Sequence, residues 1–101
     1  MNLFSIIVVS YNTKKKLIKT LNSIKKQTYN NYEIVIIDGL STDGTINFVK
    51  KNRNKKIKFF TEKDNGIYDA MNKGIKKANG QWTLFLNSGD IFVDQNILIN
   101  V

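Results

Sequence analysis

The sequence predicts an α/β fold in which helices flank a parallel β-sheet. Four short apolar runs, rich in β-branched and aromatic residues, recur along the 101 residues, and each has the length of a buried strand. Three segments with apolar residues at helical spacing separate these runs. Strands that alternate with helices form βαβ units, whose right-handed crossovers keep the strands parallel. We therefore expect a single domain over residues 1–101.

The four predicted strands differ in how strongly the sequence marks them. The first, Phe4–Ser10, has the sequence FSIIVVS, and the second, Glu33–Asp38, has the sequence EIVIID. Neither alternates polar with apolar residues, so both are expected to be buried on both faces of the sheet. The third, Ile57–Thr61, is less apolar, and the fourth is Gln81–Leu86. We predict the strand order 3-2-1-4, which is half of a Rossmann-like sheet.

Three helices are predicted between these strands. The first covers Lys14–Gln27, the second begins at Asp43, and the third covers Ile67–Ala78, with Gly80 as its C-terminal signal. Their expected inward-facing residues are Leu17, Ile18, Leu21 and Ile24 in the first helix, Ile46, Phe48 and Val49 in the second, and Ile67, Ala70, Met71, Ile75 and Ala78 in the third. A further helix over residues 95–101 is expected to begin behind Asp94 as its N-cap.

The composition fits an ordinary globular domain and excludes several classes of protein. Hydrophobic residues make up 42% of the chain, and no apolar run approaches the roughly 20 residues that a membrane-spanning helix needs. The first four residues lack the features of a secretory signal. There is no cysteine, and hence no disulfide or thiolate chemistry. We expect a cytoplasmic protein and leave open a peripheral position at the inner face of a membrane.

The net charge of +8, from 16 Lys and Arg against 8 Asp and Glu, leaves several interpretations open. A basic protein can bind nucleic acid, anionic lipid or a phosphorylated ligand. The chain also holds 15 Lys, 14 Asn and 14 Ile, a bias that an AT-rich genome would produce. We favour simple solvated lysines and do not expect a nucleic-acid partner. Attraction to a membrane surface would involve the basic cluster of Lys50, Lys51, Arg53, Lys55, Lys56 and Lys58.

The acidic residues predict a site at one edge of the sheet. Of the eight, only Glu33 lies early in a strand, and the other seven follow strand ends or open helices: Asp38, Asp43, Glu62, Asp64, Asp69, Asp90 and Asp94. In a parallel sheet such positions gather at the carboxyl edge, where α/β proteins bind ligands. Helix capping is the simpler explanation for Asp43, Asp69 and Asp94. Asp38 and Asp90 each end an apolar strand at a glycine-containing turn, which suits binding of a metal, base or sugar.

Four motifs, in this order and spacing, make the chain resemble family 2 (GT-A type) glycosyltransferases over its whole length. They are SIIVVSYN, EIVIIDGLSTDGT, DNGIYDAMNKGI and LFLNSGD. The similarity is to bacterial enzymes of capsule, colanic-acid or lipopolysaccharide synthesis. The resemblance implies a nucleotide-sugar-binding GT-A half that ends before the acceptor-binding part of the family.

The resemblance also implies roles for residues at the strand ends. Ser10, Tyr11 and Asn12 match the segment that lines the nucleotide base, and Asp38 matches the acid that hydrogen-bonds the base or ribose. A carboxylate suits that role because it accepts hydrogen bonds from an imide N–H or a sugar hydroxyl. In the loop before the third helix, near the diphosphate and the donor sugar, the matching residues are Asp64 and Gly66.

Two departures from the family pattern concern the phosphates and the metal. Where many relatives have Ala-Arg-Asn, this chain has Met71 in place of the arginine, so Lys73 is a candidate cation for the phosphates. In the family's acidic metal-binding motif, Asn87 and Gly89 stand at positions usually occupied by aspartates. Asp90 is then the expected ligand of Mg²⁺ or Mn²⁺, with Asn87 beside the donor. The alternative is that Asp90 only stabilises its own turn through local backbone hydrogen bonds.

The implied reaction transfers a sugar, with inversion, from a nucleoside-diphosphate sugar to a saccharide or lipid-linked acceptor in bacterial surface polysaccharide synthesis. The family's catalytic base lies in the second half of its domain, so no catalytic residue is assigned in this chain. Two other interpretations stay open: a nucleotide-binding module without catalysis, and an inactive structural fragment. Self-association is also left open, because an unpaired fourth strand invites strand addition.

Overall fold

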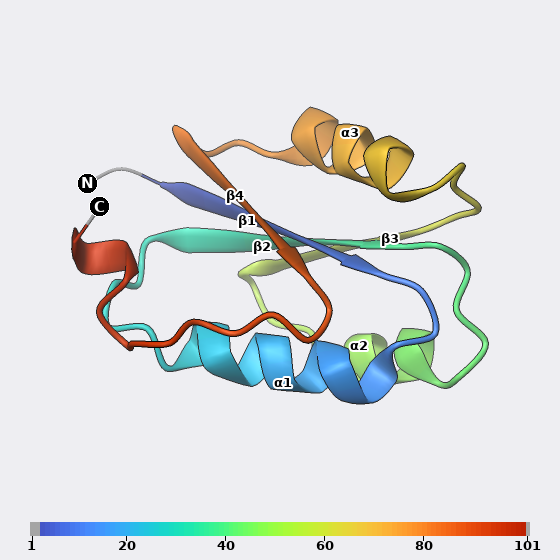
Figure 1. The fold of residues 1–101 in the computed structure, drawn as a ribbon, viewed down its shortest axis with the longest axis horizontal. Helices are drawn as coiled ribbons and strands as arrows, with labels where there is room; N and C mark the ends of the chain where they lie inside the picture. Colours follow the sequence, from blue (N-terminus) through green and yellow to red (C-terminus); the bar gives the residue numbers. More distant parts are fainter. Residues whose placement is uncertain (1–2, 101) are drawn as a thin grey trace.

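The computed structural model describes residues 3–100 and contains a four-stranded parallel sheet between two layers of helix (Figure 1). The strands are β1 (Phe4–Ser10), β2 (Tyr32–Asp38), β3 (Ile57–Thr61) and β4 (Trp82–Asn87). Their order is β3-β2-β1-β4, which confirms the predicted topology. The observed bounds differ from the predicted ones by one residue at β2 and β4.

The pairing register brings the strand ends together at one edge. Ser10 pairs with Asp38, Asp38 pairs with Thr61, and on the other side of β1 Val9 pairs with Asn87. All four strands therefore end within one residue of the same level. The loops that follow them are neighbours, which is the arrangement that a ligand site at the carboxyl edge requires.

The helices divide between the two faces of the sheet. Helices α1 (Lys14–Lys25) and α2 (Thr45–Asn52) cover one face, and α3 (Ile67–Lys77) covers the other, while a short 3₁₀ helix, η1 (Leu98–Asn100), lies near the start of β1 (Figure 1). No helix among residues 3–100 combines the length and the apolar character needed to cross a membrane.

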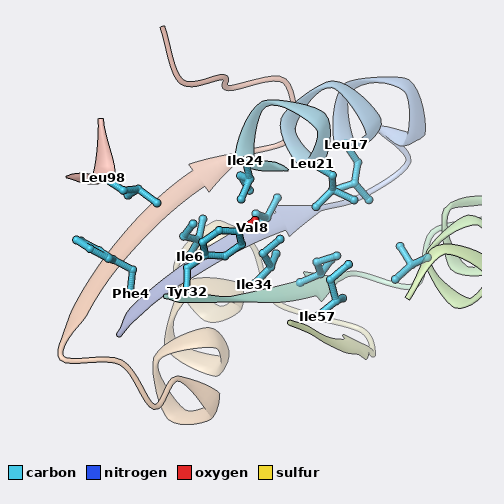
Figure 2. Packing of buried hydrophobic residues seen from close by; sticks show 12 residues of the cluster. Phe4, Ile6, Val8, Leu17, Leu21, Ile24, Tyr32, Ile34, Ile57 and Leu98 are labelled. Carbon is cyan, nitrogen blue, oxygen red and sulfur yellow. The ribbon is translucent and has the colours of Figure 1, made fainter. Parts of the chain in front are cut away.

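Alternate residues of the strands supply two separate cores. On the α1 and α2 face, Ile6 and Val8 pack against Leu17, Leu21 and Ile24 (Figure 2). On the α3 face, the smaller core consists of Ile7, Val35, Ile37 and Ala70. Burying one such aliphatic side chain contributes about 1.5–3 kcal/mol, so the larger core dominates the stability of the fold.

The packing of α3 corrects part of the sequence prediction. Ala70 is buried as expected, but Ile67 and Ile75 are about half exposed, and the other fully packed position is Gly74. A Cβ atom added to Gly74 would lie 2.4 Å from the side chain of Ile7. The helix therefore contacts the sheet through its smallest residues, and its larger apolar side chains lie at the flank of the contact.

Strand β4 leaves an apolar surface open beside it. Within residues 3–100 it pairs only with β1, and Trp82 and Phe85 are 49% and 40% exposed. On the α3 side, Phe85 shares a shallow hollow with Ile67 and Met71. Within residues 3–100, the fourth strand thus has the open edge that the sequence led us to expect, and exposed aromatic side chains lie along it.

The expected α-helix after Asp94 is wrong over its described part, residues 95–100. The chain runs back along α1, where the Gln27 side chain donates to the Asp94 carbonyl at 2.6 Å and accepts from the Leu98 amide at 3.1 Å. The Thr28 amide donates to the Gln95 carbonyl at 2.8 Å. These bonds with the end of α1 take backbone groups that a helix would use internally. Val101 lies outside the described residues.

Asp94 consequently lies at the amino edge of the sheet and not at the carboxyl edge. Its carboxylate accepts the Asn96 amide at 2.8 Å, so it closes a local turn. The other six acids of the predicted group follow strand ends or begin α3 at the carboxyl edge: Asp38, Asp43, Glu62, Asp64, Asp69 and Asp90.

Candidate functional site

A hollow of about 330 Å³ lies at the carboxyl edge, between the ends of β1 and β4 and the start of α3. Its lining residues are Val9, Ser10, Tyr11, Thr13, Asp64, Gly66, Ile67, Ala70, Asn87 and Ser88. Five of them, Ser10, Tyr11, Asp64, Gly66 and Asn87, are residues that the sequence singled out. The fold thus brings together residues from three separate loops.

The floor of this edge is a close contact between the loops after β1, β2 and β3. A Cβ atom added to Gly39 would lie 2.9 Å from the Asp64 carboxylate and 3.3 Å from the Tyr11 ring. Glycine therefore lets these two side chains approach the end of β2. Tyr11 is 62% exposed, so its ring presents an apolar face beside a carboxylate. Such a pair suits a flat, hydrogen-bonding ligand.

Asp38 lies below this surface and is fully buried. Its Oδ2 accepts hydrogen bonds from the Ser41 amide at 2.8 Å and the Thr61 hydroxyl at 2.9 Å, and its Oδ1 accepts the Ser41 hydroxyl at 2.5 Å. Direct contact between Asp38 and a ligand stays a prediction. In this structure the carboxylate acts through Ser41 and Thr61, whose positions it fixes.

Ser41 links Asp38 to the loop after β1. Its hydroxyl oxygen accepts the Asn12 amide at 2.9 Å, while the Asn12 side-chain oxygen accepts the Thr42 amide at 2.7 Å. Asn12 has φ +51°, a left-handed conformation that asparagine tolerates better than most residues. Asn12 therefore joins the two loops, and it lines a neighbouring hollow with Lys14 and Asp43 instead of the central one.

Asp43 holds the same pair of loops from outside. Its carboxylate accepts the Lys14 amide at 2.9 Å, the Thr45 amide at 3.2 Å and the Thr45 hydroxyl at 2.5 Å. The pKa of Asp43 is lowered, first by the hydrogen bond from the Thr45 hydroxyl and then by the one from the Lys14 amide. The N-cap of α2 is Gly44 and not Asp43, so the expected capping role is wrong in that form; Asp43 lies one residue earlier and holds Thr45, the first residue of the helix.

Asp90 closes a tight turn over residues 87–90. Its Oδ2 accepts the Asn87 amide at 2.8 Å, its own amide donates to the Asn87 carbonyl at 2.9 Å, and Gly89 supplies φ +103°. Thr20, buried in α1, anchors the turn: its hydroxyl accepts the Gly89 amide at 2.8 Å and donates to the Asp90 carbonyl at 2.7 Å. The turn is thus held against α1 in a defined orientation.

The donor set at this turn is sparse for a metal ion. Among residues 3–100 there is no group of three or more His, Cys, Asp or Glu side chains that could hold one. Asp90 is exposed, and the turn uses its Oδ2. Mg²⁺ commonly binds through one or two protein carboxylates and completes its shell with phosphate oxygens and water. The residues present fit a metal that arrives with phosphates better than a metal held by the protein alone.

Lys73, expected near the phosphates, lies away from the central hollow. It lines a separate hollow over β3, and its ammonium group forms ion pairs with the Glu62 and Asp69 carboxylates, both at 3.2 Å. The pKa of Asp69 is lowered, first by the Asn65 amide and then by Lys73. Burial works to lower the pKa of Lys73, but its two acidic partners outweigh this and raise it. The structure gives Lys73 no contact with the central hollow.

Three polar residues that organise the site were not predicted from the sequence. Thr20 occupies a core-spaced position between Leu17 and Ile24, where a hydroxyl in an apolar series was an available signal. Ser41 follows Asp38 by three residues, a spacing that suits a side chain closing its own turn. Thr61 had no such signal, because its partner lies on another strand.

Comparison with known proteins gives consistent matches. Glycosyl transferase family 2 matches residues 5–98. A PGL/p-HBAD biosynthesis glycosyltransferase of Mycobacterium bovis is 37% identical over 102 residues, which cover 98% of this chain and 40% of that protein. The poly(ribitol-phosphate) β-N-acetylglucosaminyltransferase TarS of Staphylococcus aureus is 37% identical over 92 residues, covering 86% of this chain and 16% of that protein.

Solved structures share the fold. The crystal structure of S. aureus TarS 1–349 in complex with UDP-GlcNAc superposes with a TM-score of 0.88 at 34% identity, covering 99% of this chain and 30% of that one. A mannosyltransferase from Pyrobaculum calidifontis, in complex with GDP-Man and Mn²⁺, gives 0.87 at 24% identity over 96% of this chain and 30% of that one. The second match supports the fold alone. The chain therefore spans less than half the length of these relatives.

Proposed function

The chain belongs to glycosyl transferase family 2, and we propose that it binds the nucleoside-diphosphate sugar of a glycosyl transfer. The observation that carries the proposal is the carboxyl-edge hollow, where Tyr11 and Asp64 from two loops meet Asn87 at the end of β4. The superposed crystal structure of TarS, which is 34% identical to this chain, is a complex with UDP-GlcNAc.

In the proposed binding mode, the base lies against the exposed ring of Tyr11 and the diphosphate extends toward the 87–90 turn. Asp64 accepts hydrogen bonds from the ribose or the donor sugar. Asp38 holds Ser41 and, through it, the Asn12 backbone, so that the loop carrying Tyr11 is already formed before the ligand arrives. Such preorganisation reduces the entropy cost of binding.

The transfer itself is proposed to proceed with inversion. An acceptor hydroxyl oxygen forms the new bond to the anomeric carbon as the bond to the diphosphate breaks, and the hydroxyl proton passes to a carboxylate. No acid of the described residues is assigned that last role. Mg²⁺ or Mn²⁺ at Asp90 would supply charge neutralisation for the leaving diphosphate. The Asp90 carboxylate would orient that ion, because Thr20 and Asn87 fix the turn.

The acceptor is proposed to be a saccharide or lipid-linked molecule of a bacterial cell surface. The support is the kind of work named for the relatives, PGL/p-HBAD biosynthesis in one and poly(ribitol-phosphate) modification in the other. The chain spans 40% or less of those proteins, so the complete transfer reaction stays a proposal for this chain.

Calorimetric titration with a panel of nucleoside diphosphates, with and without Mn²⁺, tests the donor-binding role. We expect one nucleoside diphosphate to bind, with higher affinity when Mn²⁺ is present. Asp90→Asn should remove the Mn²⁺ enhancement, while the matched variant Asn87→Ala should retain most of it. Absence of binding by every nucleoside diphosphate would contradict the proposed function. A full Mn²⁺ enhancement in Asp90→Asn would contradict only the metal role.

A further inference from the structure

Charge is strongly segregated between the two edges of the sheet. At the amino edge, where the strands begin and the helices end, lie ten of the sixteen basic residues: Lys25, Lys26, Lys50, Lys51, Arg53, Lys55, Lys56, Lys58, Lys76 and Lys77. Only two acids, Glu33 and Asp94, share that edge, and Glu33 is paired with Lys58 at 2.7 Å. The carboxyl edge holds the remaining six acids against five lysines, and the sixth remaining lysine, Lys19, lies midway along α1. The positive charge of the chain is therefore concentrated opposite the candidate site.

Most of this basic edge is exposed and not neutralised. Lys56 donates to the Asn30 carbonyl and lies over the Tyr32 ring, and Lys77 lies over the Phe60 ring. The cations Lys25, Lys26, Lys50, Lys51, Arg53, Lys55 and Lys76 are exposed, and no ion pair holds any of them among residues 3–100. Lysines in the last turns of helices also complement the helix dipoles. Arg53 is the C-cap of α2 and shares that effect, but Lys55, which lies further along the connection after α2, is not explained by it.

Exposed apolar side chains lie at the same edge as these cations. Trp82 begins β4 and is 49% exposed, Ile75 lies in the last turn of α3 and is 52% exposed, and Ile99 lies in η1 and is 55% exposed. Figure 1 shows the start of β4 and η1 at the same end of the sheet, and α3 runs toward that end. Tryptophan, lysine and arginine are residue types that gather at membrane–water interfaces.

We propose that the amino edge docks on a membrane surface that carries anionic phospholipid headgroups. The cations attract the surface, and Trp82, Ile75 and Ile99 enter the headgroup layer. A nucleic acid would use the same cations, but aliphatic side chains offer it no comparable contact. Docking by this edge turns the carboxyl-edge hollow away from the lipid, open to a soluble ligand. The proposal is independent of the identity of that ligand.

The single tryptophan makes the test direct, since Trp82 is the only one in the chain. The chain is titrated with vesicles of phosphatidylcholine containing 30% phosphatidylglycerol and, separately, with phosphatidylcholine alone. We expect a blue shift of the Trp82 emission and co-sedimentation with the anionic vesicles only, weakened by 0.5 M salt. The variant Lys51→Glu, Arg53→Glu, Lys55→Glu should lower the partition coefficient by about 100-fold or more.

A charge-matched control separates the edge from the net charge. The variant Lys15→Glu, Lys19→Glu, Lys63→Glu changes the net charge equally, but at exposed positions away from the amino edge. Circular dichroism confirms that both variants are folded, and this control should keep most of its vesicle binding. Equal loss in both variants, no binding to anionic vesicles, or binding to an oligonucleotide in preference to vesicles would each overturn the proposal. Nucleoside-diphosphate affinity, measured in the same samples, is expected to stay unchanged in the amino-edge variant.

Discussion

Replacing Asp38 by asparagine tests how the buried carboxylate organises the candidate site. The substitution keeps the shape of the side chain but turns one acceptor oxygen into an N–H donor. An asparagine oxygen at the Oδ2 position can keep the bonds from Ser41 and Thr61. The amide nitrogen then faces the Ser41 hydroxyl, which in the native protein donates to Oδ1 at 2.5 Å and also accepts the Asn12 amide.

The variant therefore loses at least one hydrogen bond to a charged group in a fully buried position. A bond of this kind contributes about 1.5–3 kcal/mol, so we expect a loss of that size in the free energy of unfolding. The matched control is Asp43→Asn, since Asp43 is exposed and holds the same pair of loops from outside. Because Asp43 is exposed, Asp43→Asn should lower the free energy of unfolding less than Asp38→Asn does.

Urea denaturation, followed by circular dichroism, measures both variants. Because Asp38 holds Ser41 and through it the loop of Tyr11, we also expect nucleotide affinity to fall more in Asp38→Asn than in Asp43→Asn. We expect the same order for the alanine variants, with nucleotide affinity lower in Asp38→Ala than in Asp43→Ala. If Asp38→Asn and Asp43→Asn were equally stable and bound nucleotide equally well, the organising role of Asp38 would be refuted.

Three further substitutions probe other parts of the fold. Gly74→Ala places a methyl group against Ile7 and should cost about 1–3 kcal/mol despite the better helix propensity of alanine, so an unchanged melting temperature would contradict the close packing of α3. Thr20→Val removes the anchor of the Gly89 amide and should cost about 1–3 kcal/mol, with faster hydrogen exchange at Gly89; native protection there would argue against it. Glu33 is the third position. Burial works to raise its pKa, but hydrogen bonds from an amide, a lysine and a serine outweigh this and lower it below 4.5. The stability that this carboxylate contributes is therefore present above that pH and is lost as the pH falls further, so Glu33→Gln should flatten the acid limb of the stability curve. Parallel acid limbs in the two proteins would contradict this.

Much of the fold could be predicted because buried strands and amphipathic helices leave local signals. The β-branched runs of β1 and β2 fixed the centre of the sheet, and alternation with helices gave the parallel topology. The exposure of Ile67 and Ile75 could not be predicted in this way. It depends on Gly74 meeting Ile7 across the chain, a contact between residues that periodicity does not link.

The candidate site was predictable as a location more than as a set of contacts. Strand ends in a parallel sheet must meet at one edge, so Ser10, Asp64 and Asn87 come together by topology alone. The burial of Asp38 could not be predicted without knowing that Thr61, on a neighbouring strand, donates a hydrogen bond to it. Asp94 lies at the amino edge because the side chain of Gln27 binds the chain that returns along α1. A local capping pattern does not reveal such a contact between residues far apart in the sequence.

Chemical-shift mapping by nuclear magnetic resonance shows whether the carboxyl-edge hollow binds the nucleoside diphosphate. The ¹⁵N-labelled chain is titrated with the nucleoside diphosphate identified by calorimetry, in the presence of Mg²⁺. We expect the largest amide shifts at Tyr11, Gly66 and Asn87, with little change at Lys51 and Lys55. Largest shifts at the basic amino edge, with the hollow unaffected, would contradict it.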